Sequence, residues 1–138
     1  QGDRHELRKG ERPPVNIVDS SGWLEYFANG PNAQRFLPAL RDAASLVVPV
    51  VSIYEVFKVV LRESGENAAI QAVMAMQKAT VVDMTPRLAM AAAKTSLELS
   101  LPMADSIILA TARLHNATIW TQDAHFKDLG GVKYFAKR

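Results

Sequence analysis

The sequence predicts an α/β protein, a three-layer α/β/α sandwich built on a mostly parallel sheet of four to five strands. Short apolar runs alternate with helical segments along the chain, which is typical of parallel strands joined by crossover helices. Three of these runs are apolar almost throughout, as expected of strands that are buried on both faces. Ligands of such sheets bind outside the carboxyl ends of the strands, so we expect a functional site at that edge.

The first half of the predicted domain contains two strands. A β-branched run that ends at Asp19 forms the first of them, and Asn29-Gly30-Pro31 closes the helix that follows. Gly65 ends a later helix. In chain order the predicted segments are a strand over 15–19, a helix from Ser20 to the Asn29 turn, a helix over 32–43, a strand over 46–48, and helices over 52–64 and 66–79.

The second half continues the alternation. Pro86 stands at a tolerated first-turn position of an alanine-rich helix. The predicted segments are a strand over 80–83, helices over 86–99 and 102–115, a strand over 117–120, a turn or short helix over 123–129, and a fifth strand over 132–135 at an edge of the sheet.

The composition is that of one globular domain. Of the 138 residues, 49% are apolar and 22% are charged, and a chain of this length needs neither disulfides nor a structural metal to fold. The absence of cysteine excludes thiolate zinc sites and fits a reducing, cytoplasmic compartment. We assign residues 15–138 to the domain and the polar residues 1–14 to a flexible N-terminal extension or a segment introduced by cloning. No apolar run reaches the roughly 20 residues of a membrane span.

The net charge of +2 gives no overall basic field of the kind that indicates a nucleic-acid-binding protein. A local basic patch is available near the end of the chain, although a solvated tail explains the same residues. The patch comprises Lys127, Lys133, Lys137 and Arg138.

Four carboxylates, Asp19, Glu55, Asp105 and Asp123, lie where a strand gives way to a helix or where a helix begins. Because the carboxyl ends of parallel strands share one edge of the sheet, we expect the four acids to meet in one pocket. Each acid also has a purely structural explanation. These are a helix N-cap for Asp19, a capping box with Ser52 for Glu55, a first-turn position for Asp105, and a turn or cap position for Asp123.

Clustered carboxylates repel one another, and a divalent cation is the usual remedy. Nearby helix N-termini should keep the acids ionised. Two cations roughly 3.5 to 4 Å apart would neutralise four carboxylates and support an in-line phosphoryl displacement. Hard oxygen ligands favour Mg²⁺ or Mn²⁺ over zinc. His125, close to Asp123 in sequence, is a candidate for the pocket rim.

Segments 15–20, 52–55, 104–112 and 119–126 resemble the motifs of the PIN domain, in particular those of the VapC-type toxin ribonucleases. The most specific are Ala-Asp-Ser-Ile-Ile-Leu-Ala and Thr-x-Asp-x-His-Phe, and the resemblance extends from about residue 15 to residue 135. It implies an α/β/α sandwich and an endoribonuclease that depends on Mg²⁺ or Mn²⁺. The implied metal-binding and catalytic acids are Asp19, Glu55, Asp105 and Asp123, oriented by the hydroxyls of Thr121 and Ser20.

The same resemblance implies a homodimer, an RNA substrate, and a small VapB-like antitoxin whose C-terminal segment enters the acidic groove. Gln122 stands where the family often has a basic residue, so we expect altered RNA contacts at this position. Trp23, Tyr26 and Phe27 follow a helical spacing and are candidates for RNA-stacking platforms, for the core or for a dimer surface.

Two other function classes remain open from sequence. One is a non-catalytic PIN-like module that binds RNA or protein. The other is a different Mg²⁺-dependent phosphohydrolase on a doubly wound sheet, for which Asp-x-Asp is expected after the first strand. Ser21 occupies the second of those positions.

Overall fold

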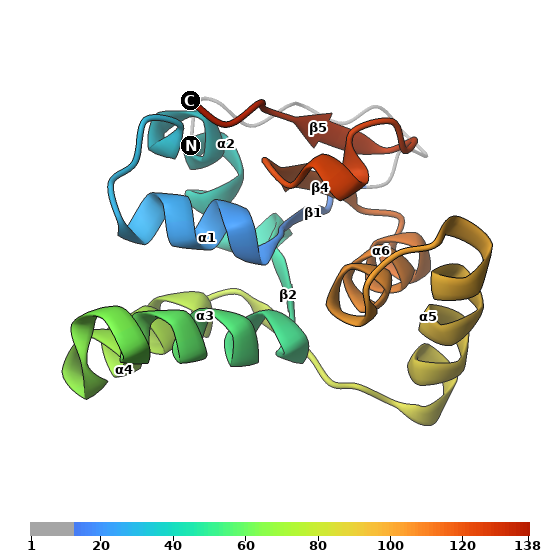
Figure 1. Ribbon diagram of the computed structural model, residues 1–138, viewed down its shortest axis with the longest axis horizontal. Helices are drawn as coiled ribbons and strands as arrows, with labels where there is room; N and C mark the ends of the chain where they lie inside the picture. Colours follow the sequence, from blue (N-terminus) through green and yellow to red (C-terminus); the bar gives the residue numbers. More distant parts are fainter. Residues whose placement is uncertain (1–12) are drawn as a thin grey trace.

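Short parallel strands form the centre of the molecule in the computed structural model, which describes residues 13–138 (Figure 1). Nearly all of the predicted extension over residues 1–14 lies outside the described residues. The strands are β1 (Asn16–Val18), β2 (Val47–Pro49), β3 (Thr80–Val82), β4 (Thr118–Thr121) and β5 (Val132–Tyr134).

All strand pairings are parallel. β1 pairs with β4, β4 with β5, and β2 with β3. An isolated parallel bridge between Asn16 and Leu46 joins the two pieces of the sheet. The strand order is therefore β3-β2-β1-β4-β5, with β5 at an edge as predicted.

Helices follow most of the strands, as the alternating sequence pattern predicts. They are α1 (Ser20–Phe27), α2 (Ala33–Leu40), α3 (Val50–Ser64), α4 (Glu66–Met76), α5 (Pro86–Leu99) and α6 (Met103–His115), with short 3₁₀ helices η1 (Ala43–Ser45) and η2 (Ala124–Phe126). Figure 1 shows α5 and α6 on one side of the sheet and α1 to α4 on the other. No described helix is both long and apolar enough to cross a membrane.

Alternate residues of each strand pack into opposite layers. Ile17, Val47 and Ile119 belong to the core that includes Leu109 of α6. Their sequence neighbours point the other way, because side chains alternate along a strand. Val18, Val48 and Trp120 pack against Trp23, Phe36 and Val56 of the helices α1, α2 and α3. The sheet is thus buried on both faces, which confirms the three-layer sandwich and places Trp23 in the core.

Three helix boundaries differ from the prediction by two residues or more, and one of them is the end of the helix predicted over 66–79, which the structure places at Met76. The predicted helix over 32–43 ends at Leu40, and η1 follows it. The helix predicted to begin at Ser52 begins at Val50, with Pro49 as the N-cap residue in an extended conformation. Proline has no backbone N–H to lose, so the chain passes directly from β2 into α3. The predicted capping box is therefore wrong, because Ser52 is buried inside the first turn and Glu55 lies in the second turn.

Close packing brings the start of α1 to the carboxyl end of β1. A Cβ atom on Gly22 would lie 2.6 Å from Val18 Cγ1 and 2.7 Å from Phe36 Cε1. Only glycine allows this approach. The first turn of α1 consequently stays against the sheet edge where the acids are expected.

Candidate active site

Asp19 lies at the end of β1, where it caps α1. Its Oδ1 accepts hydrogen bonds from the backbone N–H of Gly22 at 3.1 Å and from the Ser21 hydroxyl at 2.7 Å. Its other oxygen, Oδ2, accepts from the Thr121 hydroxyl at 2.7 Å. Asp19 is only 2% exposed. The capping explanation for this acid is therefore correct, but it accounts for one of several bonds to a deeply buried carboxylate.

The Thr121 hydroxyl connects two of the predicted acids. It donates to Asp19 Oδ2 and accepts a hydrogen bond from the backbone N–H of Asp123 at 2.8 Å. Ser21 makes a parallel link, because its hydroxyl donates to Asp19 and accepts from the backbone N–H of Gln122 at 3.2 Å. The end of β4 is thus fastened to the end of β1 by two hydroxyls.

Asp105 and Asp123 meet at His125. Asp105 lies in the first turn of α6 and Asp123 caps η2, accepting from the backbone N–H of His125 at 2.9 Å. The Nδ1 atom of His125 lies 2.8 Å from Asp105 Oδ2 and 3.1 Å from Asp123 Oδ1. The ligating atoms of these three residues all lie within 4.8 Å of one another.

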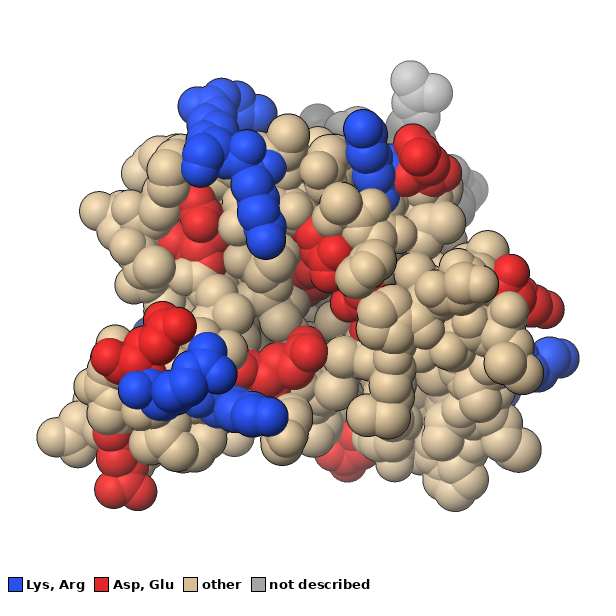
Figure 2. All heavy atoms as spheres, viewed as in Figure 1, with Lys and Arg blue, Asp and Glu red and all other residues tan. Residues whose placement is uncertain are grey.

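Glu55 completes the group from α3. Its Oε1 accepts a hydrogen bond from the Ser20 hydroxyl at 2.5 Å. Its charge also contributes to the raised pKa of Asp105. The structure therefore brings the four predicted acids together at one sheet edge. The Thr121 hydroxyl is hydrogen-bonded to Asp19 and Asp123, and the Ser20 hydroxyl is hydrogen-bonded to Glu55. In Figure 2, acidic side chains occupy the middle of one face, with lysine and arginine side chains above and below them.

Burial and mutual repulsion make two of the acids hard to ionise. Desolvation raises the pKa of Asp19 to about 7, against the lowering effect of its hydrogen bonds. Desolvation and then the charge of Asp123 raise the pKa of Asp105 to about 6. Burial thus opposes the ionising effect that we expected the helix N-termini to have on Asp19 and Asp105.

The carboxylate oxygens are suitable ligands for a hard divalent cation. Their repulsion, which contributes to both raised pKa values, is the condition that a cation relieves. Asp105, Asp123 and His125 form the most compact donor group among the described residues. The residues present therefore fit Mg²⁺ or Mn²⁺.

The structure gives three residues contacts that differ from those expected from the sequence. Ser21 contacts Asp19 directly, whereas the sequence pointed to Ser20. His125, expected only at the rim, contacts both Asp105 and Asp123. Gln122 is buried and bonded to Asn32 and Glu25 instead of pointing to solvent. The contacts of Ser21 with Asp19 and of His125 with Asp123 span only two residues. Those of His125 with Asp105 and of Gln122 with Asn32 and Glu25 join distant elements, and the sequence contains no signal for them.

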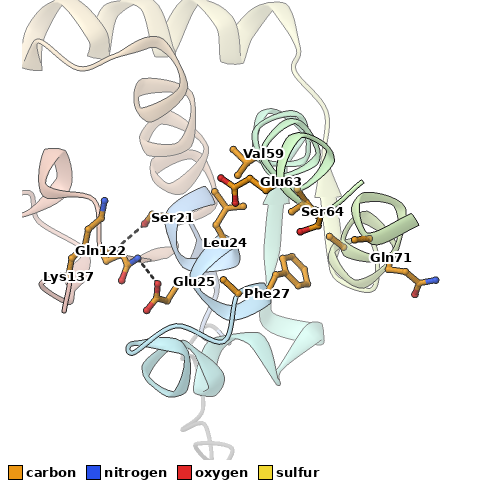
Figure 3. A pocket seen from close by; sticks show the side chains of 14 residues that line it. Ser21, Leu24, Glu25, Phe27, Val59, Glu63, Ser64, Gln71, Gln122 and Lys137 are labelled. Carbon is orange, nitrogen blue, oxygen red and sulfur yellow. Dashed lines mark hydrogen bonds between the residues drawn. The ribbon is translucent and has the colours of Figure 1, made fainter. Parts of the chain in front are cut away.

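A cavity of about 580 Å³ opens beside this group and extends along α1 towards α3 and α4 (Figure 3). Ser21 and Gln122 lie at one end of it, with Lys137 close by. Its walls include Leu24 and Phe27 of α1. The cavity is thus continuous with the hydroxyl that holds Asp19.

The family profile described as the PIN domain matches residues 17–132 of this chain. The chain belongs to the PIN domain family. The matched region of this PIN domain includes all four acids, together with Thr121 and His125. No curated protein matches the sequence at a significant level.

Solved structures of toxin–antitoxin proteins share the fold of this PIN domain. A toxin–antitoxin complex from Klebsiella pneumoniae aligns with a TM-score of 0.76 and 21% identity, covering 90% of this chain and 100% of that chain. VapC20 of Mycobacterium tuberculosis, described as a Sarcin-Ricin loop cleaving toxin, aligns at 0.71 and 18%, covering 84% and 95%. VapBC2 from Rickettsia felis, bound to a DNA fragment from its promoter, aligns at 0.68 and 12%, covering 88% and 98%.

Proposed function

We propose that this PIN domain is a metal-dependent endoribonuclease that hydrolyses RNA phosphodiester bonds, and that it is the toxin of a VapBC-like toxin–antitoxin pair. The observation that carries the proposal is the convergence of four carboxylates from separate elements, with two pKa values raised by burial and mutual repulsion. Structural acids are usually paired with lysine or arginine, whereas repelling acids in a cleft indicate a functional site.

Asp19, Glu55, Asp105 and Asp123 would hold Mg²⁺ or Mn²⁺. When bound, the metal would lower the pKa of an attacking water and stabilise charge on the leaving oxygen. The hydroxyls of Thr121, Ser21 and Ser20 hold the carboxylates in place before substrate arrives. Such pre-organisation is expected of groups that act on a developing charge.

His125 supplies a group that can carry a proton at the edge of the cluster. Its side chain is 56% exposed, while its Nδ1 atom contacts Asp105 and Asp123. The same Nδ1 atom lies within 4.8 Å of the ligating oxygens of Asp105 and Asp123. We therefore assign His125 to the opening of the site, where it would add a nitrogen ligand to the carboxylates.

The surface around the acids provides the charge that RNA requires. Basic side chains lie on either side of the acidic middle of the face in Figure 2. On α3, Lys58 and Arg62 follow Glu55 at three and seven residues, which places them on the same side of the helix. Lys137 lines the cavity on the opposite side. Phosphates on both sides of the cut bond would contact these cations.

A VapB-like antitoxin is the expected protein partner, since the structural neighbours include VapBC complexes. The C-terminal segment of the antitoxin would enter the acidic groove. We also expect a homodimer. The apolar side chains of Met90, Leu97 and Met103 are 65%, 86% and 74% exposed on α5 and α6, which is unusual for a monomer. With RNA as the substrate and a VapB-like antitoxin as the partner, we expect the activity to be cytoplasmic.

Cleavage of total cellular RNA tests the function. Purified protein, freed of bound partner by unfolding and refolding, is incubated with Mn²⁺ or Mg²⁺, and the fragments are mapped by sequencing their ends. Discrete fragments are expected with the wild-type protein. EDTA and Asp105→Asn should abolish them, whereas Asp128→Asn, the same change at an exposed acid, should not. A refolded, partner-free protein that leaves all RNA intact would favour the non-catalytic binding module.

A further inference from the structure

A closed ring of hydrogen bonds lies next to the proposed site and joins α1, the start of α2 and the residue that follows β4. Asn32 Nδ2 donates to Gln122 Oε1 at 2.9 Å, and Gln122 Nε2 donates to Glu25 Oε1 at 3.2 Å. The backbone N–H of Asn32 donates to Glu25 Oε2 at 2.6 Å, which closes the ring. Asn32 is fully buried and Gln122 is 8% exposed. Figure 3 shows the bond between Gln122 and Glu25.

The ring holds the side chain of Gln122, which lies in the sequence between two residues of the proposed site. Gln122 stands between Thr121, which contacts Asp19, and Asp123, which contacts His125. Its backbone N–H donates to Ser21, and its side chain is held by the ring. The backbone of Gln122 therefore has little freedom to rotate, and its conformation determines where the next residue, Asp123, is placed.

Two backbone groups determine which atom donates and which accepts in every hydrogen bond of the ring. The backbone N–H of Asn32 can only donate, and the carbonyl of Ala136, which accepts from Asn32 Nδ2 at 3.0 Å, can only accept. Glu25 must accept twice, so Gln122 must present its amide N–H to Glu25 and its carbonyl to Asn32. If the side-chain amide of Gln122 or Asn32 were rotated by about 180°, two donors or two acceptors would face each other.

The lack of a side chain at Gly30 leaves room for the Glu25 carboxylate in the ring. The carboxylate folds back over the turn after α1, where a Cβ on Gly30 would lie 2.4 Å from Glu25 Oε2. A larger residue at position 30 would push the carboxylate out of the ring without changing any ring atom.

We propose that the Glu25–Gln122–Asn32 ring is a positioning device for the metal site: it sets the place of Asp123 opposite Asp105 and thereby the affinity for the divalent cation. This inference rests on the proposed function, because it assumes that Asp123 binds metal. Among the described residues, no hydrogen bond joins these three to a carboxylate oxygen of the four proposed metal ligands. Outer partners of this kind typically change metal affinity by about 10- to 100-fold when they are replaced.

An exchange of charge between two ring members tests the proposal. Glu25→Gln alone puts an amide NH₂ against a donor, and Gln122→Glu alone puts two carboxylates together. The double variant Glu25→Gln/Gln122→Glu restores every bond, because the carboxylate at position 122 then accepts from Asn32 Nδ2 and from the introduced amide. The introduced carbonyl at position 25 accepts from the backbone N–H of Asn32. The net charge equals that of the wild-type protein.

The readout is Mn²⁺ affinity, measured by isothermal titration of the whole chain with Mn²⁺ alone, alongside melting in EDTA. Each single variant should bind Mn²⁺ about tenfold more weakly, and the double variant should return to within about threefold of the wild-type protein. Gly30→Ala should weaken binding in the same way and provides a second route if either single variant does not fold.

Thr85→Ala is the matched control, since it removes the N-cap of α5, whose hydroxyl accepts from Leu88 N–H at 3.1 Å away from the ring. It should lower the melting temperature with no change in Mn²⁺ affinity. Ring variants that melt earlier but keep wild-type Mn²⁺ affinity would show a merely structural network and overturn the proposal, as would a double variant no better than the single ones. A wild-type protein that binds no Mn²⁺ would instead overturn the proposed function, and the positioning role with it.

Discussion

Replacing Asp105 by asparagine should make the metal-free protein more stable, even though it removes a buried polar contact. Burial and the charges of Asp123 and Glu55 raise the pKa of Asp105 from 3.8 to about 6. A group whose pKa is raised on folding binds more protons in the native state, so stability falls as pH rises from about 4 to about 6 and stays low above that range. Asparagine carries no such penalty.

The size of the effect follows from the shift in pKa. About two units at roughly 1.36 kcal/mol each correspond to roughly 3 kcal/mol at pH 8. The Asp105 side chain is only 12% exposed, so solvent screens little of this energy. That pKa already includes the favourable contact with His125, so nothing further is subtracted for it. We therefore expect Asp105→Asn to gain roughly 3 kcal/mol at pH 8 and almost nothing at pH 4.

Urea unfolding in EDTA at pH 4 and pH 8 measures this difference. With a slope between about 1 and 3 kcal/mol per molar urea, the midpoint of Asp105→Asn should lie about 1 to 3 M above that of the wild-type protein at pH 8. Asp128→Asn, at an exposed acid, should leave the midpoint unchanged at both pH values. A variant that is less stable than the wild-type protein at pH 8, or a gain of equal size at pH 4, would refute the reasoning.

Three further results are expected. Mn²⁺ at about 100 times its Kd should stabilise the wild-type protein by roughly 2.7 kcal/mol. Calorimetric scans should show a smaller stabilisation at pH 5.5 than at pH 8, because Asp19 and Asp105, with pKa values of about 7 and 6, must lose protons to bind the ion. An equal stabilisation at both pH values would contradict this. Thr121→Val should lose roughly 2–4 kcal/mol of unfolding free energy and all RNA cleavage, because Asp19 and the Asp123 N–H each lose a partner, whereas Thr121→Ser should retain both. Leu97→Glu should convert a dimer into a monomer in light-scattering measurements, since this side chain is 86% exposed on the apolar face of α5; an unchanged mass would place the dimer surface elsewhere.

The sequence predicted the fold because its local signals and its packing agree. The β-branched runs, Pro86 at the start of α5 and Gly65 at the end of α3 all follow from local chemistry. The predicted start of α3 was wrong because two local signals competed there. Ser52 and Glu55 have the spacing of a capping box, yet the helix begins two residues earlier at Val50 because Pro49 can leave the strand directly.

The acids of the candidate site were predictable as a set because parallel strands bring their carboxyl ends to one edge. Their protonation was not predictable, since the pKa of Asp19 depends on how deeply the side chain is buried and on bonds from Ser21 and Thr121. The interior role of Gln122 was also invisible. Its partners, Asn32 and Glu25, are 90 and 97 residues away in the chain, and nothing in the local pattern distinguishes a buried glutamine from an exposed one.

The isolated bridge between Asn16 and Leu46 divides the sheet into two blocks, and the candidate site spans the division. Asp19 and Asp123 follow strands β1 and β4 of one block, whereas Glu55 is carried by α3 after β2 of the other. No continuous ladder of backbone bonds sets the distance between Glu55 and Asp19 among the described residues, so side-chain packing and the Ser20 hydroxyl must do so. The width of the carboxylate cluster therefore depends mainly on packing between the two blocks. If the cluster binds cations as proposed, we expect it to adjust to ions of different radius while the backbone ladder of each block stays intact.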